Sequence, residues 1–171
     1  MAPVKLKYED PHLHYIAITA IIRKGGKYLI TKRSPKERAF PNMWTVPGGR
    51  IDARDYIKTP KTTDSGWYYE VERTLKREIR EEVNLEVSNV MYLLDLTFVR
   101  PEGIPTVVLS FYADYKSGKV KLAEDTEFAW VTPKEAKKYD LIAGIYEEIV
   151  MAEKLNNGAK FSSVKFKPQK R

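Results

Sequence analysis

The most informative part of the chain is the run Arg77-Glu78-Ile79-Arg80-Glu81-Glu82-Val83-Asn84-Leu85, which lies 28 residues after Gly49. It places three carboxylates, Glu78, Glu81 and Glu82, at spacings of three and four residues, so a helix would project them from one side. Like charges held that close repel one another unless something compensates them, and hard divalent cations bind clustered carboxylate oxygens. The run therefore predicts half of a magnesium site and favours an enzyme.

A second reading of the same run is a solvated helix face, in which Arg77 pairs with Glu81 one turn away. The glycine pair upstream favours the metal site over this alternative. Gly48 and Gly49 are expected to form a tight turn, where a backbone carbonyl is free to bind a cation and a phosphate can approach closely. The preceding strand ends in Lys32-Arg33, and the side chains of Lys32 and Arg33 are candidates for holding phosphate oxygens.

Length and composition are those of one soluble globular domain. The chain has 171 residues, of which 43% are hydrophobic and 31% charged, and it has no cysteine, which excludes disulfides and thiolate chemistry. Its longest apolar run, near residues 16–22, is too short to span a bilayer, and the first ten residues lack the apolar core of a secretory signal. We therefore expect a cytoplasmic protein with no membrane partner.

Part of the net charge of +7 is concentrated near the end of the chain. We expect residues 1–155 to form the domain and residues 156–171 to form a flexible basic tail, whose cations are Lys160, Lys165, Lys167, Lys170 and Arg171. Such a tail is a candidate for contact with nucleic acid through phosphates. Elsewhere, positive charge would steer an anionic small molecule towards a cleft.

Apolar periodicity predicts a mixed sheet covered by helices. The runs that we expect to be strands are residues 14–23, 28–33, 43–46, 90–100, 106–115 and 127–131. A helix is expected over residues 67–83, because apolar side chains recur there at helical spacing, and Asn84 is expected to cap it in a left-handed conformation. Further helices are expected from Pro133 and over residues 143–155. The expected fold class is α/β (α+β), with helices on the faces of the sheet.

Two separated segments together resemble the Nudix box, Gly-x5-Glu-x7-Arg-Glu-U-x-Glu-Glu-x-Gly-U, in which U is a bulky aliphatic residue; they are Gly49 and Arg77–Leu85. The lead-in Trp44-Thr45-Val46-Pro47-Gly48-Gly49 and the segment Phe128–Thr132 are also similar to segments of that family. The resemblance extends from about residue 15 to about residue 139. It implies a Nudix-type α/β/α sandwich with a mixed β-sheet.

The resemblance implies roles for individual residues. Glu81 and Glu82 match the two principal metal ligands, Glu78 matches the third, and the Gly49 carbonyl matches the backbone ligand. Arg77 matches an arginine that orients these carboxylates. The implied cofactor is Mg²⁺, with Mn²⁺ as a substitute, which polarises a diphosphate and activates a water for attack on phosphorus.

The chain departs from the family pattern at three places. The interval from Gly49 to Arg77 is 14 residues longer, so we expect an inserted loop within residues 52–67 that lies beside the cleft and forms part of the substrate pocket. Counting back from Arg77, the first glutamate of the box falls on Tyr69 and is unmatched. Asn84 stands for the closing glycine, and asparagine is suited to the positive φ that such a glycine adopts.

Residues outside the box are expected to complete the site. Members of the family often use a further acid as a ligand or base, and Glu127 is our candidate, ahead of Glu124 and Glu102. Trp44 is a candidate for stacking on a nucleobase, and packing in the core is an equally good reading. Gly48, in the tight turn, is expected to contact the substrate.

The expected activity is magnesium-dependent hydrolysis of a pyrophosphate bond in a nucleoside diphosphate derivative, and the lead-in segment and compact size favour a nucleoside triphosphate. An ADP-ribose or nucleotide-sugar pyrophosphatase is the alternative. Two readings of other classes are an RNA 5′-end hydrolase, which would use the basic tail, and a catalytically silent nucleotide-binding module, against which the three retained glutamates argue. Homodimers are common in the family, although no segment of the sequence identifies an interface.

Overall fold

The computed structural model describes residues 10–124 and 126–168, which form one mixed seven-stranded sheet with helices. The strands are β1 (Tyr15–Lys24), β2 (Lys27–Lys32), β3 (Trp44–Thr45), β4 (Gly48–Arg50), β5 (Leu85–Val99), β6 (Pro105–Gly118) and β7 (Phe128–Val131). Their order is β3-β2-β1-β6-β5, while β4 also pairs with β1 and β7 with β2. Because β1 runs parallel to β6 and antiparallel to β2 and β4, the sheet is mixed, as predicted.

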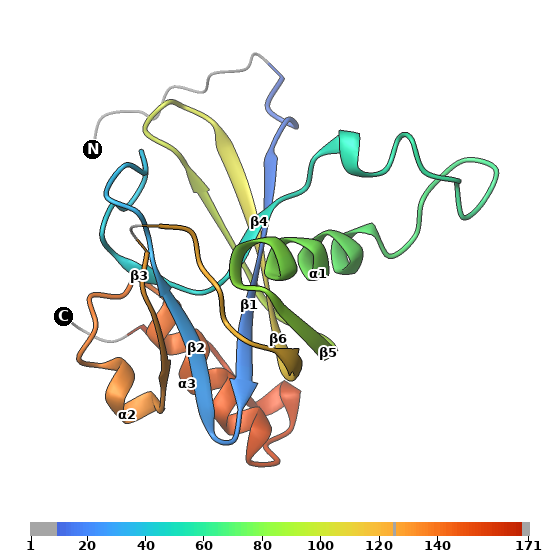
Figure 1. Ribbon diagram of the computed structural model, residues 1–171. Helices are drawn as coiled ribbons and strands as arrows, with labels where there is room; N and C mark the ends of the chain where they lie inside the picture. Colours follow the sequence, from blue (N-terminus) through green and yellow to red (C-terminus); the bar gives the residue numbers. More distant parts are fainter. Residues whose placement is uncertain (1–9, 125, 169–171) are drawn as a thin grey trace.

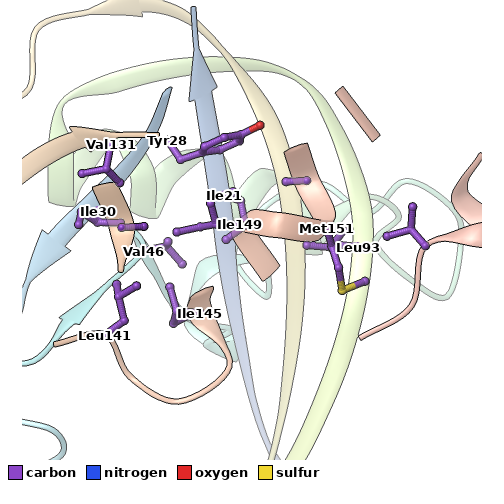
Figure 2. Close-up of a cluster of buried hydrophobic side chains, with 13 residues drawn as sticks. Ile21, Tyr28, Ile30, Val46, Leu93, Val131, Leu141, Ile145, Ile149 and Met151 are labelled. Carbon is purple, nitrogen blue, oxygen red and sulfur yellow. The ribbon is translucent and has the colours of Figure 1, made fainter. Parts of the chain in front are cut away.

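Helices cover both faces of this sheet (Figure 1). Helix α1 (Glu70–Val83) lies on one face and α3 (Ile145–Asn156) on the other, while the short α2 (Pro133–Ala136) follows β7. Alternation along β1 explains the two cores, because Ile18 and Ile22 pack with the residues of α1 and Ile21 packs with those of α3 (Figure 2). The α/β/α sandwich is therefore confirmed.

Helix α1 begins at Glu70, three residues later than predicted. Tyr69 has a φ of 65°, a left-handed conformation that is incompatible with a right-handed helix, so the helix starts after this residue. Trp67 belongs to the preceding loop, where its indole N–H donates to the Thr59 carbonyl at 3.0 Å. At the other end the prediction is confirmed, since Asn84 has a φ of 55° and caps the helix through a bond from its N–H to the Arg80 carbonyl.

The insertion follows a short 3₁₀ helix, Ala53–Asp55, and precedes α1. In Figure 1 this segment projects away from the sheet as a long excursion before it returns to the start of α1. Its two ends are held together by Tyr56 and Trp67, whose rings lie 5.1 Å apart. The insertion thus occupies residues 56–69, a shorter and later range than the sequence indicated.

The segment predicted to be a basic tail is described as far as residue 168, so Lys170 and Arg171 lie outside the described residues. Phe161–Ser163 form a second 3₁₀ helix, and Val164 is only 7% exposed because it packs in the core beside α3. Within residues 156–168, burial of the Val164 side chain holds part of this segment against the domain, and the flexibility of the segment stays a prediction. Among the described residues, no helix is long and apolar enough to cross a membrane.

Candidate active site

Gly48 and Gly49, which were predicted to form a tight turn, lie instead in strand β4, and this pair, called the glycine turn below, is pressed between the sheet and α1. In β4, Gly48 pairs with Thr19 and Gly49 pairs with Ile18. A Cβ atom on Gly48 would lie 2.2 Å from the Ile18 carbonyl oxygen, and one on Gly49 would lie 2.1 Å from the Glu78 carboxyl carbon. Position 48 therefore requires glycine, because a Cβ would clash with backbone, whereas at position 49 a Cβ would displace the Glu78 side chain; the close approach brings the backbone of β4 against Glu78 of α1.

Glu82 is held at the same turn. The Gly48 N–H donates to its carboxylate at 2.9 Å. Burial raises the pKa of Glu82 to about 7; the bond from Gly48 opposes that shift and the negative charge of Glu78 adds to it. A buried carboxylate thus lies close to a second one, with the glycine backbone beside both.

Arg77 joins the acids of the site into one network. Its guanidinium donates to Glu78 at 2.9 Å and to Glu81 at 2.7 Å, across one helical turn in the second case. It also donates to Asp55 at 2.9 Å, and this contact reaches across the insertion. Arg77 therefore lies where the resemblance implied, with two box carboxylates oriented by its fork of donors.

Asp55 belongs to this network, although the sequence reasoning did not name it. Counting back from Arg77 placed the first acid of the box on Tyr69, which has no carboxylate and is 78% exposed. Counting forward from Gly49 through five residues reaches Asp55 instead. The inserted residues lie between Asp55 and Arg77. Counting forward from Gly49 therefore gives the family's spacing to this acid, whereas counting back from Arg77 crosses the insertion and gives the wrong position.

The cleft beside this network carries charges of both signs. A cavity of about 780 Å³ has His14, Tyr15 and Gly49 in its lining, and its charged lining residues are Arg50, Arg54, Arg77, Asp52, Asp55 and Glu78. Arg54 is paired with Asp52 in the 3₁₀ helix, and the Arg50 guanidinium lies over the ring of Tyr15. Guanidinium groups at this edge suit the oxygens of a phosphate chain.

The candidates outside the box lie on the neighbouring strands. Lys32 forms an ion pair with Glu127 at 2.6 Å, and Arg33 pairs with Glu37 at 3.0 Å. Arg33 is near enough to Glu82 for its charge to lower the pKa of that carboxyl. Trp44 is half-buried and packs edge-on against Tyr139 with centroids 4.7 Å apart, which places it against the core on the α3 side.

A second cavity lies on the α3 side of the sheet. It has a volume of about 940 Å³ and is enclosed by β5, the connection between α2 and α3, the first turn of α3 and the end of the chain near Phe166. The connection is fixed to β3, because the Trp44 N–H donates to the Asp140 carbonyl and the Ile142 N–H donates to the Trp44 carbonyl, each at 2.8 Å. Since Trp44 leads into the Gly48-Gly49 turn, this cavity wall is attached to the segment that carries the glycines.

The arrangement of acids fits a divalent cation, although the ligands do not converge. Within residues 10–124 and 126–168, no three acidic or histidine side chains are grouped as a ready-made metal site. Glu78 and Glu81 point to Arg77, and Glu82 accepts from the Gly48 N–H. The charge of Glu78 nevertheless raises the pKa of half-buried Glu82, and a cation between them would relieve that repulsion.

Comparison with known proteins agrees with this geometry. A family model described as the NUDIX domain matches residues 12–151. Nucleoside triphosphatase NudI of Escherichia coli strain K12 is 27% identical over 135 residues, which cover 72% of this chain and 86% of that protein. Among solved structures, the NUDIX domain of Shewanella oneidensis NrtR, complexed with ADP ribose, has a TM-score of 0.64 at 16% identity and covers 84% of this chain and 89% of its own. The E. coli ORF135 protein has a TM-score of 0.61 at 22% identity and covers 86% of this chain and 95% of its own. This chain belongs to the Nudix hydrolase family and is a pyrophosphohydrolase.

Proposed function

We propose that the protein hydrolyses a pyrophosphate bond of a nucleoside triphosphate with the help of Mg²⁺. The observation that carries the proposal is the network in which Arg77 holds Asp55, Glu78 and Glu81 beside the glycine turn. A surface ion pair would not need Gly48, which backbone sterics require, or the close approach of Gly49 to the Glu78 carboxyl, whereas a metal and phosphate site does. The relative named nucleoside triphosphatase supports the choice of substrate.

The residues that would hold the cation are Glu78, Glu81, Glu82 and the Gly49 carbonyl. When bound, a divalent cation polarises the phosphoryl oxygens and generates a nucleophile from water. The role of Arg77 is to orient the glutamates. Its hydrogen bonds restrict the rotamers of their side chains, so less conformational freedom is lost when a cation binds. Mn²⁺ is expected to substitute, because it shares the preference for carboxylate oxygens.

The basic groups at the cleft would bind the phosphates. Arg50 and Arg54 line the cavity that contains Gly49 and Glu78. We assign further phosphate contacts to Lys32 and Arg33, and the role of the acid outside the box to Glu127, whose carboxylate is held by Lys32.

The test is an assay of phosphate and pyrophosphate release from nucleoside triphosphates, ADP-ribose, nucleotide sugars, dinucleoside polyphosphates and 5′-triphosphorylated RNA, with Mg²⁺. We expect nucleoside triphosphates to be the best substrates, and Glu81→Gln to lower kcat by roughly 100-fold or more. Glu72→Gln, which removes the same charge from the same helix at a residue that pairs with Lys76, is the matched control. Wild-type turnover by Glu81→Gln would overturn the mechanism, and a clear preference for ADP-ribose would replace the substrate.

Removing positive charge from the end of the chain distinguishes an RNA substrate from a nucleoside triphosphate. Replacing Lys165 and Lys167 with glutamine keeps Val164 in the core but removes cations from the end of the chain. Hydrolysis of nucleoside triphosphates should be unaffected by this double variant. A loss of activity confined to RNA, together with a steep decline in added salt, would identify an RNA-directed enzyme instead.

Asp55 provides a test of the network itself. Asp55→Asn leaves Arg77 without one of its charged partners and should lower activity by about 10-fold while leaving the fold intact. Glu70→Gln is the control, because Glu70 is the acid nearest to the position found by counting back from Arg77. If Glu70→Gln were the more damaging variant, the assignment of Asp55 would be wrong.

A further inference from the structure

Strand β5 forms one edge of the sheet, and it is long. Its 15 residues pair with β6, which is its one strand neighbour within the described part of the chain. The opposite edge consists of β3 and β7, which have two and four residues. Proteins commonly keep their edge strands short, because an exposed edge presents unpaired N–H and C=O groups to other chains. The sheet is thus protected along β3 and β7 and open along β5.

The last part of β5 is exposed and regular. Residues 95–99 are all exposed, and in Figure 1 the hairpin of β5 and β6 rises above α1 and α3. The register shifts between β5 and β6 all lie before Leu94 or at it, so residues 94–99 pair with β6 residue by residue. In a regular antiparallel ladder, alternate N–H and C=O groups of the edge strand are directed away from its neighbour. These groups are available to a further strand.

The same stretch lacks the residues that usually protect an edge. From Val90 to Val99 the sequence has no lysine, arginine, proline or glycine, and Asp95 is its only charged residue. The charge of Asp95 is engaged within its own strand, because the Tyr92 hydroxyl donates to it. An exposed, regular and mostly apolar edge of this kind favours pairing with another strand.

The alternation of side chains limits the registers in which a second copy of β5 can pair. Even-numbered and odd-numbered residues of 94–99 project from opposite faces of the sheet. Two copies of one edge strand pair antiparallel about a twofold axis perpendicular to the sheet, and directly opposite residues then project from the same face. The axis must therefore lie beside one residue, which faces its own copy, and not between two residues.

Two of these registers are unfavourable for Asp95. With the axis beside Asp95, two carboxylates would face each other, and like charges directly opposite each other destabilise a sheet. With the axis beside Thr97, each Asp95 would face the partner's Val99, which offers no donor to the carboxylate.

The register with its axis beside Leu96 matches side chains of the same kind. The two Leu96 side chains face each other, and each Leu94 faces the partner's Phe98. Each Asp95 faces the partner's Thr97, whose hydroxyl is a hydrogen-bond donor. The end of β5 is therefore complementary to a second copy of itself.

We propose that the protein forms a symmetric homodimer in which β5 pairs antiparallel with β5 of a second copy, with Leu96 beside the twofold axis. Main-chain hydrogen bonds would join the two sheets, and the facing side chains would set the register. A nucleic acid is a poor occupant of this edge, since the only charged residue of Val90–Val99 is an acid.

The absence of cysteine from the chain makes the register testable by single substitutions. One cysteine introduced at position 95, 96, 97 or 98 can form a disulfide only with its own copy, and only residues directly opposite each other have the Cα separation that a disulfide needs. Diamide, which oxidises two thiols to a disulfide, should convert Leu96→Cys to a covalent dimer. Asp95→Cys, Thr97→Cys and Phe98→Cys should react at least ~10-fold more slowly, because their copies lie two or four residues out of register.

The mass in solution tests the dimer itself. Light scattering during gel filtration at micromolar concentration should give twice 19.8 kDa for the wild type. Leu96→Lys, which would place two cations opposite each other, should give 19.8 kDa at the same concentration. The matched control is Phe128→Lys, because Phe128 is 45% exposed on β7 at the other edge and Leu96 is 41% exposed; this variant should stay dimeric.

The outcomes separate this inference from the proposed function, because neither measurement requires turnover. A monomeric wild type would overturn the inference, and so would a dimer that Leu96→Lys leaves intact. Faster crosslinking at position 95 or 97 than at position 96 would overturn the register, and crosslinking of Phe128→Cys without that of Leu96→Cys would move the interface to the other edge.

Discussion

Replacing Glu148 with glutamine should change how the stability of the protein depends on pH. The carboxyl is 4% exposed, and burial raises its pKa from the ordinary value of 4.5 to about 7. Folding therefore favours the protonated form. The stability that this preference contributes is full below about pH 4.5, and it is lost as the pH rises through about 7.

The magnitude follows from the two pKa values. Moving from 4.5 to about 7 corresponds to roughly 3 kcal/mol of unfolding free energy lost between acid and about pH 8. Glutamine has nearly the same shape, stays uncharged and can still accept from Ser110, so Glu148→Gln should lack this loss. At about pH 8 the variant should be more stable than the wild type by up to ~3 kcal/mol, or roughly 6 to 12 °C in Tm, and the gain should shrink towards about pH 5.

The assay is urea unfolding followed by tryptophan fluorescence at intervals from about pH 5 to about pH 8. Other ionisable groups that line the cavity on the α3 side, as Glu148 does, are Asp95, Lys137, Tyr139, Asp140, Tyr146 and Glu147. Glu82, whose pKa is also about 7, and these groups are present in both proteins, so their own titrations cancel in the difference, except that the charge of Glu147 contributes to the raised pKa of Glu148 and is part of the effect measured. Glu102→Gln should follow the wild type at every pH. Parallel stability curves for Glu148→Gln and the wild type would refute the reasoning, because the carboxyl would then be ionised as easily in the folded protein as in the unfolded chain.

Three further substitutions test the packing that positions the site. Gly48→Ala should abolish activity and destabilise the fold by about 1–3 kcal/mol, because the added Cβ would lie 2.2 Å from the Ile18 backbone; near-native urea unfolding and turnover would contradict this. Asn84→Ala should cost about 1 kcal/mol in the same unfolding assay, since φ is 55° there, whereas Asn84→Gly should be close to neutral; equal effects would count against the capping argument. Leu75→Ala should cost about 2–5 kcal/mol, because the side chain is 0% exposed beneath α1, and a loss well below 1 kcal/mol would contradict the packing described.

Local patterns in the sequence were sufficient to predict the scaffold. Alternation predicted the strands, and helical spacing predicted α1 and its left-handed Asn84 cap, because both depend on a residue's near neighbours. The box glutamates and Gly49 were predicted for the same reason, since their spacing is that of a helix turn and a tight turn. The mixed sheet followed from strands and helices that must cover one another.

Features that depend on tertiary packing were not predictable in the same way. Asp55 reaches Arg77 across an insertion, so a count along the chain gives a different answer in each direction. Glu148 reads in the sequence as an ordinary acid in the first turn of a helix, and only the packing of α3 against β6 buries it beside Ser110. Val164 likewise looks like part of a basic tail until the fold places it beside α3.

The carboxyls of Glu82 and Glu148, whose pKa values are both raised, are held apart by the same strands. The Gly48 N–H donates to Glu82, and the strand partner of Gly48 is Thr19, whose hydroxyl contacts Ser110 next to Glu148. The separation between the acid of the cleft and the acid of the cavity is therefore set by β4, β1 and β6, which are hydrogen-bonded to each other, and not by a loop. Strands hold side chains at more constant distances than loops do, so the distance between the carboxyls of Glu82 and Glu148 should be insensitive to changes in the loops. The insertion, by contrast, begins after Asp55, whose carboxylate accepts from Arg77, so changes in its length should alter the rim of the cleft and leave this distance unchanged.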